Sequence, residues 1–103
     1  MIQVNGEWML VGERQAEIVV NVGDMLEYLT NGFLRSTMHG VMNPADPESV
    51  RYSLPFFGHG HPDAVLHVPD RFRGEGFPEA PPDITCGEHL QRTLRQTITI
   101  KAA

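Results

Sequence analysis

The side chains best suited to chemistry lie on two segments near the middle of the chain. Arg35, Thr37 and His39 occupy every second position of the first segment, and Arg51 and Ser53 do the same in the second. Residues two apart point to the same face of a β-strand, so each set would share one face. If the two strands are neighbours with those faces turned inward, an imidazole, a guanidinium and a hydroxyl converge in one cavity. Burying such groups without partners costs free energy, so a bound metal ion or anion is their natural complement.

A second interpretation of the same spacing needs no site. Polar residues at every second position also occur on a strand face that looks into solvent, where the side chains are simply hydrated. The pattern alone therefore leaves both a buried site and a solvated surface open.

Several spaced motifs connect these segments to a known family. They are residues 21–27 (NVGDMLE), 30–32 (TNG), 36–39 (STMH), 43–44 (NP) and 51–57 (RYSLPFF). By these motifs the sequence closely resembles the C-terminal signature of the iron(II)- and 2-oxoglutarate-dependent dioxygenases of the isopenicillin N synthase-like family. The similarity runs in register from about Ile2 to about Arg95, which is nearly the whole chain.

The resemblance assigns roles to three residues. It implies that His39 is a metal ligand, the second histidine of an iron triad of two histidines and one carboxylate, a donor set that suits Fe(II). It implies that Arg51 and Ser53 bind the distal carboxylate of 2-oxoglutarate, for which a guanidinium offers two parallel donors. The implied cofactors are thus Fe(II) and the cosubstrate 2-oxoglutarate, and the implied reaction couples decarboxylation of 2-oxoglutarate to oxidation of a small organic substrate. No further catalytic residue is assigned.

The sequence departs from the family pattern in the rest of the iron site. The family's first two ligands form a His-x-Asp motif far upstream of the second histidine, but no histidine precedes His39 here. Asp24 matches the family's structural Gly-Asp turn, and residues 61–63 (His-Pro-Asp) follow the Arg-x-Ser motif, so neither is expected to be the missing pair. Gly40 stands where relatives usually place Arg. We therefore expect residues 1–103 to be the C-terminal half of a dioxygenase domain that lacks the His-x-Asp half of the site and binds iron weakly alone.

Turn and strand signals dominate the first two thirds of the chain. An Asn-Gly dipeptide at 5–6 predicts a hairpin between strands 2–4 and 8–11, and a second at 31–32 predicts a hairpin between 25–30 and 33–42. The apolar run 18–22 is typical of a strand covered on both faces. A further long strand is expected over 50–57 and a short one over 64–68.

One helix is expected, at the C-terminal end. Thr85 and Glu88 have the spacing of a capping box, and Leu90 and Leu94 fall on one face after it. Short strands with a terminal helix describe a β-sandwich or barrel fragment. With the resemblance, the expected fold is mainly β, a partial double-stranded β-helix of jelly-roll or cupin type with one C-terminal helix.

The amino-acid composition argues against some classes of binding partner. Eight Lys and Arg against thirteen Asp and Glu give a net charge of -5 with no basic stripe, which argues against nucleic acid. No segment resembles a secretion signal or a membrane span, so we expect a soluble, cytoplasmic protein with no membrane partner. Cys86 is the only cysteine, which excludes an intrachain disulfide.

An alternative function keeps the half-barrel without catalysis. Open strand edges invite pairing with another chain, so the protein could be a binding or interaction module, covered by a second copy of itself or by a complementary chain. The sequence does not indicate which substrate an enzyme of this kind would act on, because variable loops around the active site determine substrate specificity.

Overall fold

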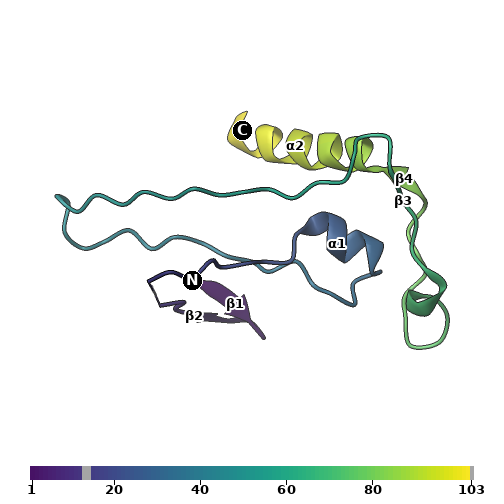
Figure 1. Ribbon diagram of the computed structural model, residues 1–103, viewed down its shortest axis with the longest axis horizontal. Helices are drawn as coiled ribbons and strands as arrows, with labels where there is room; N and C mark the ends of the chain where they lie inside the picture. The colour runs from purple at the N-terminus through teal and green to yellow at the C-terminus, as the bar shows by residue number, and fades with distance from the viewer. Residues whose placement is uncertain (13–14, 103) are drawn as a thin grey trace.

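The chain begins with a tight hairpin that leads into two helices and a second small sheet. Figure 1 shows the computed structural model, which describes residues 1–12 and 15–102. Its elements in chain order are β1 (Ile2–Val4), β2 (Glu7–Met9), α1 (Asp24–Leu29), β3 (Val65–Leu66), the 3-10 helix η1 (Asp70–Phe72), β4 (Ile84–Thr85) and α2 (Cys86–Ala102).

The first hairpin is confirmed. β1 pairs antiparallel with β2, with Val4 opposite Glu7 beside the turn. Asn5 and Gly6 both have positive φ, 50° and 84°, as a two-residue hairpin turn of this kind requires.

A third segment joins β1 on its other edge. The amide of Gln3 donates to the carbonyl of Met38 at 2.8 Å, and the amide of Gly40 donates to the carbonyl of Met1 at 3.0 Å. We call this pairing of residues 1–3 with residues 38–40 the β1 ladder. It is the only part of the expected strand 33–42 that has a β partner within the described chain.

The second Asn-Gly dipeptide ends a helix, and the hairpin expected there is wrong. The amide of Gly32 donates to the carbonyl of Glu27 at 2.9 Å, and the amide of Asn31 donates to that of Tyr28 at 3.1 Å. These are the two bonds of a Schellman cap, which needs positive φ after the helix. Asn31 and Gly32 supply it with φ of 50° and 79°. An Asn-Gly pair thus specifies the backbone conformation but not the element that precedes it.

A small core lies where α1 packs against β3, β4 and the start of α2. β3 and β4 are antiparallel, with Leu66 opposite Ile84, which confirms the short strand expected at 64–68. The buried core residues are Leu66, Val68, Ile84 and Cys86, and Met25, Tyr28 and Leu29 of α1 pack against the cluster of Leu66, Ile84 and Cys86.

The C-terminal helix begins with the expected capping box. The amide of Glu88 donates to the hydroxyl oxygen of Thr85 at 3.1 Å, and the amide of Thr85 donates to the carboxylate of Glu88 at 3.0 Å. These reciprocal bonds satisfy two backbone donors at the helix start, so this prediction is confirmed in its details.

Residues 41–60 form an extended arm, drawn in teal in Figure 1, that runs away from the core and returns. The arm reverses at a turn in which the amide of Ser49 donates to the carbonyl of Asp46 at 3.1 Å. The strand expected over 50–57 is not formed there, and neither is the one over 18–22, among the described residues. A strand needs a hydrogen-bonded neighbouring strand, and within residues 1–12 and 15–102 neither segment pairs with one. Val22 accepts a single backbone hydrogen bond from Thr37, while Leu54 is 99% exposed and Ile18 90% exposed.

Two antiparallel sheets and a C-terminal helix are consistent with the expected mainly β class, with α1 as an addition to it. Within the part of the chain that the structure describes, neither helix combines the length and the apolar character needed to cross a membrane.

Candidate functional site

His39 lies on the β1 ladder, directly opposite Ile2. Its ring is exposed, and its Nδ1 lies 2.8 Å from the carbonyl oxygen of Thr37. A carbonyl oxygen can only accept, so in the neutral ring Nδ1 carries the hydrogen and Nε2 keeps its lone pair. Metal-binding histidines commonly hold their second ring nitrogen in this way, so His39 fits the role of a metal ligand through Nε2.

The start of α1 fixes the chain just before His39. The hydroxyl of Ser36 donates to a carboxylate oxygen of Asp24 at 2.8 Å, and the Ser36 amide donates to the carboxylate of Glu27. The amide of Thr37 donates to the carbonyl of Val22 at 3.2 Å. Asp24 and Glu27 thus hold the segment that presents the histidine, which agrees with a structural role for Asp24.

Arg51 and Ser53 lie on the returning half of the arm, and both are exposed. They alternate in the sequence with Tyr52 and Leu54, which are 92% and 99% exposed, so neither the polar nor the apolar side chains of this segment are buried. Within residues 1–12 and 15–102, no hydrogen bond or ion pair joins either of them to His39.

A complete metal centre is not present among the described residues. No group of three or more His, Cys, Asp or Glu side chains there is arranged to hold a metal ion. In the His-Pro-Asp turn, Nδ1 of His61 lies 3.9 Å from the carboxylate of Asp63, and both side chains are largely exposed. The ring of the neighbouring His59 stacks on Phe57 at 6.2 Å between centroids.

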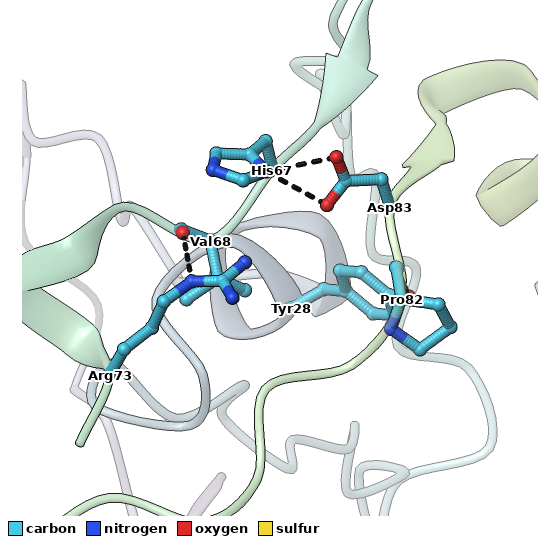
Figure 2. A network of polar contacts seen from close by, with 6 residues as sticks. All are labelled: Tyr28, His67, Val68, Arg73, Pro82 and Asp83. Carbon is cyan, nitrogen blue, oxygen red and sulfur yellow. Dashed lines mark hydrogen bonds and ion pairs between the residues drawn. The ribbon is translucent and has the colours of Figure 1, made fainter.

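A separate group of polar contacts lies near the ends of β3 and β4, as Figure 2 shows. Nδ1 of His67 lies 2.9 Å from each carboxylate oxygen of Asp83. This pair continues the register of β3 and β4 by one step, because Leu66 already faces Ile84. The sequence alone does not reveal this pair, because the partner of His67 becomes evident only once the strand register is known.

The loop between β3 and β4 is tied to the end of α1. The side-chain amide of Asn31 donates to the carbonyls of Phe72 and Pro78, at 3.0 and 2.9 Å. The rings of Phe33, Phe72 and Phe77 pack together with centroids 5.4 to 6.3 Å apart. This loop therefore belongs to the scaffold.

An open cleft of about 450 Å³ is lined by residues of α1, of α2 and of the loop before β4. Its lining contains Tyr28 and His89, whose rings meet edge to face at 5.4 Å. His39, Arg51 and Ser53 are not part of it. The cleft is thus distinct from the residues to which the motifs assign chemistry.

Comparison with known proteins bears on those motifs. The sequence profile of the 2OG-Fe(II) oxygenase superfamily matches residues 1–60, a segment that contains His39, Arg51 and Ser53. No solved structure shows a significant match.

Curated relatives extend the similarity over most of the chain. A 2-oxoglutarate-Fe(II) type oxidoreductase of Aspergillus fumigatus is 37% identical over 93 residues, covering 90% of this chain and 27% of the relative. The 2-oxoglutarate-dependent dioxygenase citB of Monascus ruber is 34% identical over 96 residues, covering 93% and 28%. Gibberellin 20 oxidase 4 of Arabidopsis thaliana is 33% identical over 92 residues, covering 89% and 23%. The chain spans about a quarter of the length of these relatives, and it belongs to the 2OG-Fe(II) oxygenase superfamily.

Proposed function

We propose that residues 1–103 are the C-terminal part of an iron(II)- and 2-oxoglutarate-dependent dioxygenase domain of the isopenicillin N synthase-like type. The whole protein would couple decarboxylation of 2-oxoglutarate to oxidation of a small organic substrate. The family match over residues 1–60 supports the reaction class, and the names of the relatives point to the same cosubstrate.

The observation that carries the proposal is the state of the His39 ring. Its Nδ1–H is engaged by the carbonyl of Thr37 at 2.8 Å, which leaves Nε2 as the atom for iron. As the family resemblance implies, we assign the other two ligands to a His-x-Asp motif outside these 103 residues. Among the described residues, no cluster completes a site. When bound, iron supplies the positions at which 2-oxoglutarate and dioxygen meet.

Arg51 and Ser53 would anchor the distal carboxylate of 2-oxoglutarate. Both are exposed and make no hydrogen bond in the described structure, so their donors are free to bind an anion. The guanidinium can donate two parallel hydrogen bonds and the hydroxyl a third. Their role is to fix the cosubstrate in one orientation.

The remaining polypeptide would also complete a double-stranded β-helix. Ile18, Val20, Leu54 and Phe56 are 86 to 99% exposed, an unusual state for apolar residues on extended segments. In a completed barrel, strands on both sides would pair with these segments and bury them.

The same exposed residues favour a second candidate, a non-catalytic interaction module. In that case another chain would cover the arm without supplying iron ligands. The two candidates differ in whether covering the arm creates iron-dependent chemistry.

A chimera separates these candidates. The residues that precede the matched segment in the Aspergillus fumigatus relative are joined to the N-terminus of this chain, and succinate formation from 2-oxoglutarate is measured with Fe(II) and oxygen. We expect Fe(II)-dependent succinate formation that His39→Ala abolishes and that His67→Ala, a matched exposed histidine, leaves intact. Equal activity in the chimera and its His39→Ala variant would contradict the proposal, and a folded but inactive chimera would favour the interaction module.

A further inference from the structure

The β1 ladder places one side chain directly beside His39. Ile2 and His39 form its central bridge, and backbone hydrogen bonds of residues 1 and 3 with residues 40 and 38 flank this pair. A pair enclosed in this way is not itself hydrogen-bonded, the arrangement in which opposite side chains come closest, with Cα atoms about 4.5 Å apart. Ile2 therefore lies next to the imidazole on the same face of the ladder.

The row continues onto the hairpin. Ile2 also pairs with Met9 of β2, so Met9, Ile2 and His39 follow one another across three antiparallel segments. Ile2, in the middle, is only partly exposed, whereas Met9 on the outer strand is 53% exposed. The imidazole thus lies beside a β-branched side chain. Because such a side chain has few χ1 rotamers, it moves little and can restrict the ring.

A second contact restrains the ring from its own segment. The carbonyl of Thr37 accepts the hydrogen of Nδ1 at 2.8 Å, and Thr37 is itself tied to Val22 by its amide. One neighbour therefore limits the ring's rotation and the other selects which nitrogen carries the hydrogen.

We infer that Ile2 is a positioning residue for His39, and that the β1 ladder keeps the ring in the rotamer whose Nδ1–H reaches the carbonyl of Thr37. An unrestrained neutral imidazole favours the other tautomer, in which Nε2 carries the hydrogen and cannot bind a metal. Holding the ring beforehand removes that rearrangement from the cost of metal binding. The inference rests on the proposed function only for what Nε2 binds, because the tautomer is a property of the chain without metal.

The test is the tautomer of His39 in the metal-free 103-residue chain, read from its two imidazole ¹⁵N shifts at a pH where the ring is neutral. In the unmodified chain the Nδ1–H form should dominate. Ile2→Ala should make the Nε2–H form the major one, and Ile2→Val, which keeps the branched side chain, should restore the original ratio. Hydrogen exchange of the Gln3 and Gly40 amides reports in parallel whether the ladder itself still forms.

The matched control is Val4→Ala, which shortens a side chain two residues along the same face of β1 where the partner is Glu7 instead of His39. Val4→Ala should leave the tautomer unchanged. An unchanged tautomer in Ile2→Ala, with or without the ladder, overturns the inference, and an equal change in Val4→Ala assigns the effect to the hairpin as a whole and overturns the role of Ile2. Neither result bears on whether His39 binds iron, which the chimera decides separately.

Discussion

Two regions of this molecule differ in how far their apolar side chains are buried by other residues of the same chain. The packed unit, made of α1, β3, β4 and the first turns of α2, has its own buried residues and a confirmed helix cap. The site region, made of the hairpin, the β1 ladder and the arm, contains the three residues to which the family motifs assign roles, but most of its large apolar side chains are exposed. The difference indicates that the packed unit is scaffold. Under the proposed function, further polypeptide would cover the arm and complete the site to which the β1 ladder contributes His39.

The largest expected effect separates the two regions by stability. Leu66 is 6% exposed, so Leu66→Ala should destabilise the packed unit by about 2–5 kcal/mol through lost contacts and a cavity. Leu54 is 99% exposed, and Leu54→Ala should change the stability of the isolated chain by no more than about 0.5 kcal/mol. Urea unfolding followed by the helical circular dichroism signal measures both.

In the chimera, the expected effect of Leu54→Ala changes, whereas that of Leu66→Ala stays the same. If the arm is buried in a completed barrel, Leu54→Ala should there cost about as much as Leu66→Ala, and an unchanged chimera would argue against a buried arm.

The next effect concerns binding. Arg51→Lys replaces a planar fork with a point charge, so it should weaken 2-oxoglutarate binding to the chimera by about 1.5–3 kcal/mol, roughly 10- to 150-fold. Isothermal titration with 2-oxoglutarate in the presence of a redox-inert metal measures the affinity. Arg92→Lys, which changes an exposed arginine of α2, is the matched control and should bind normally; equal weakening in both variants would remove the special role of Arg51.

A smaller effect lies at the start of α2. Thr85→Ala removes the acceptor of the Glu88 amide and should cost about 1 kcal/mol of stability. The control is Thr97→Ala, since the Thr97 hydroxyl only donates back to the carbonyl of Thr93 within the helix. That variant should be neutral or slightly stabilising. Comparable losses in the two variants would mean that the capping box contributes nothing specific.

The smallest effect is expected at Gly40, where the family resemblance places Arg. A Cβ built there meets only the Trp8 ring, at 4.0 Å, which is ordinary contact. Gly40→Arg should therefore change stability by no more than about 0.5 kcal/mol. Thermal unfolding measures it, and a loss of several degrees would show that the ladder has less room than the structure indicates.

Turns and helix caps could be predicted from the sequence where both interacting residues lie within a few positions of each other. The hairpin at Asn5-Gly6 and the capping box of Thr85 and Glu88 each close within a few residues, and both are confirmed. The dipeptide Asn31-Gly32 satisfied the same positive φ requirement in a helix cap, so the hairpin expected there was wrong. The expected strand over 50–57 failed for a different reason, because a strand is defined by a hydrogen-bonded neighbour and none of the described residues provides one there.

The assignment of His39, Arg51 and Ser53 to a site stays a prediction, and their arrangement in space was not predictable. Polar and apolar residues alternate around Arg51 and Ser53 in the sequence, but in the arm both kinds of side chain are exposed. The place of His39 beside Ile2 depends on which segments meet, and its contact with the carbonyl of Thr37 depends on the rotamer of the ring, so both required the structure.

The central claim, that His39 and residues outside these 103 form one iron site that 2-oxoglutarate enters, has a direct spectroscopic test. Chelation of Fe(II) by 2-oxoglutarate without oxygen produces a visible charge-transfer absorption, which can be recorded for the chimera under anaerobic conditions. We predict that the band appears on adding 2-oxoglutarate to the iron-loaded chimera and is lost in His39→Ala but kept in His67→Ala. A band of undiminished intensity in the His39→Ala chimera would contradict the account.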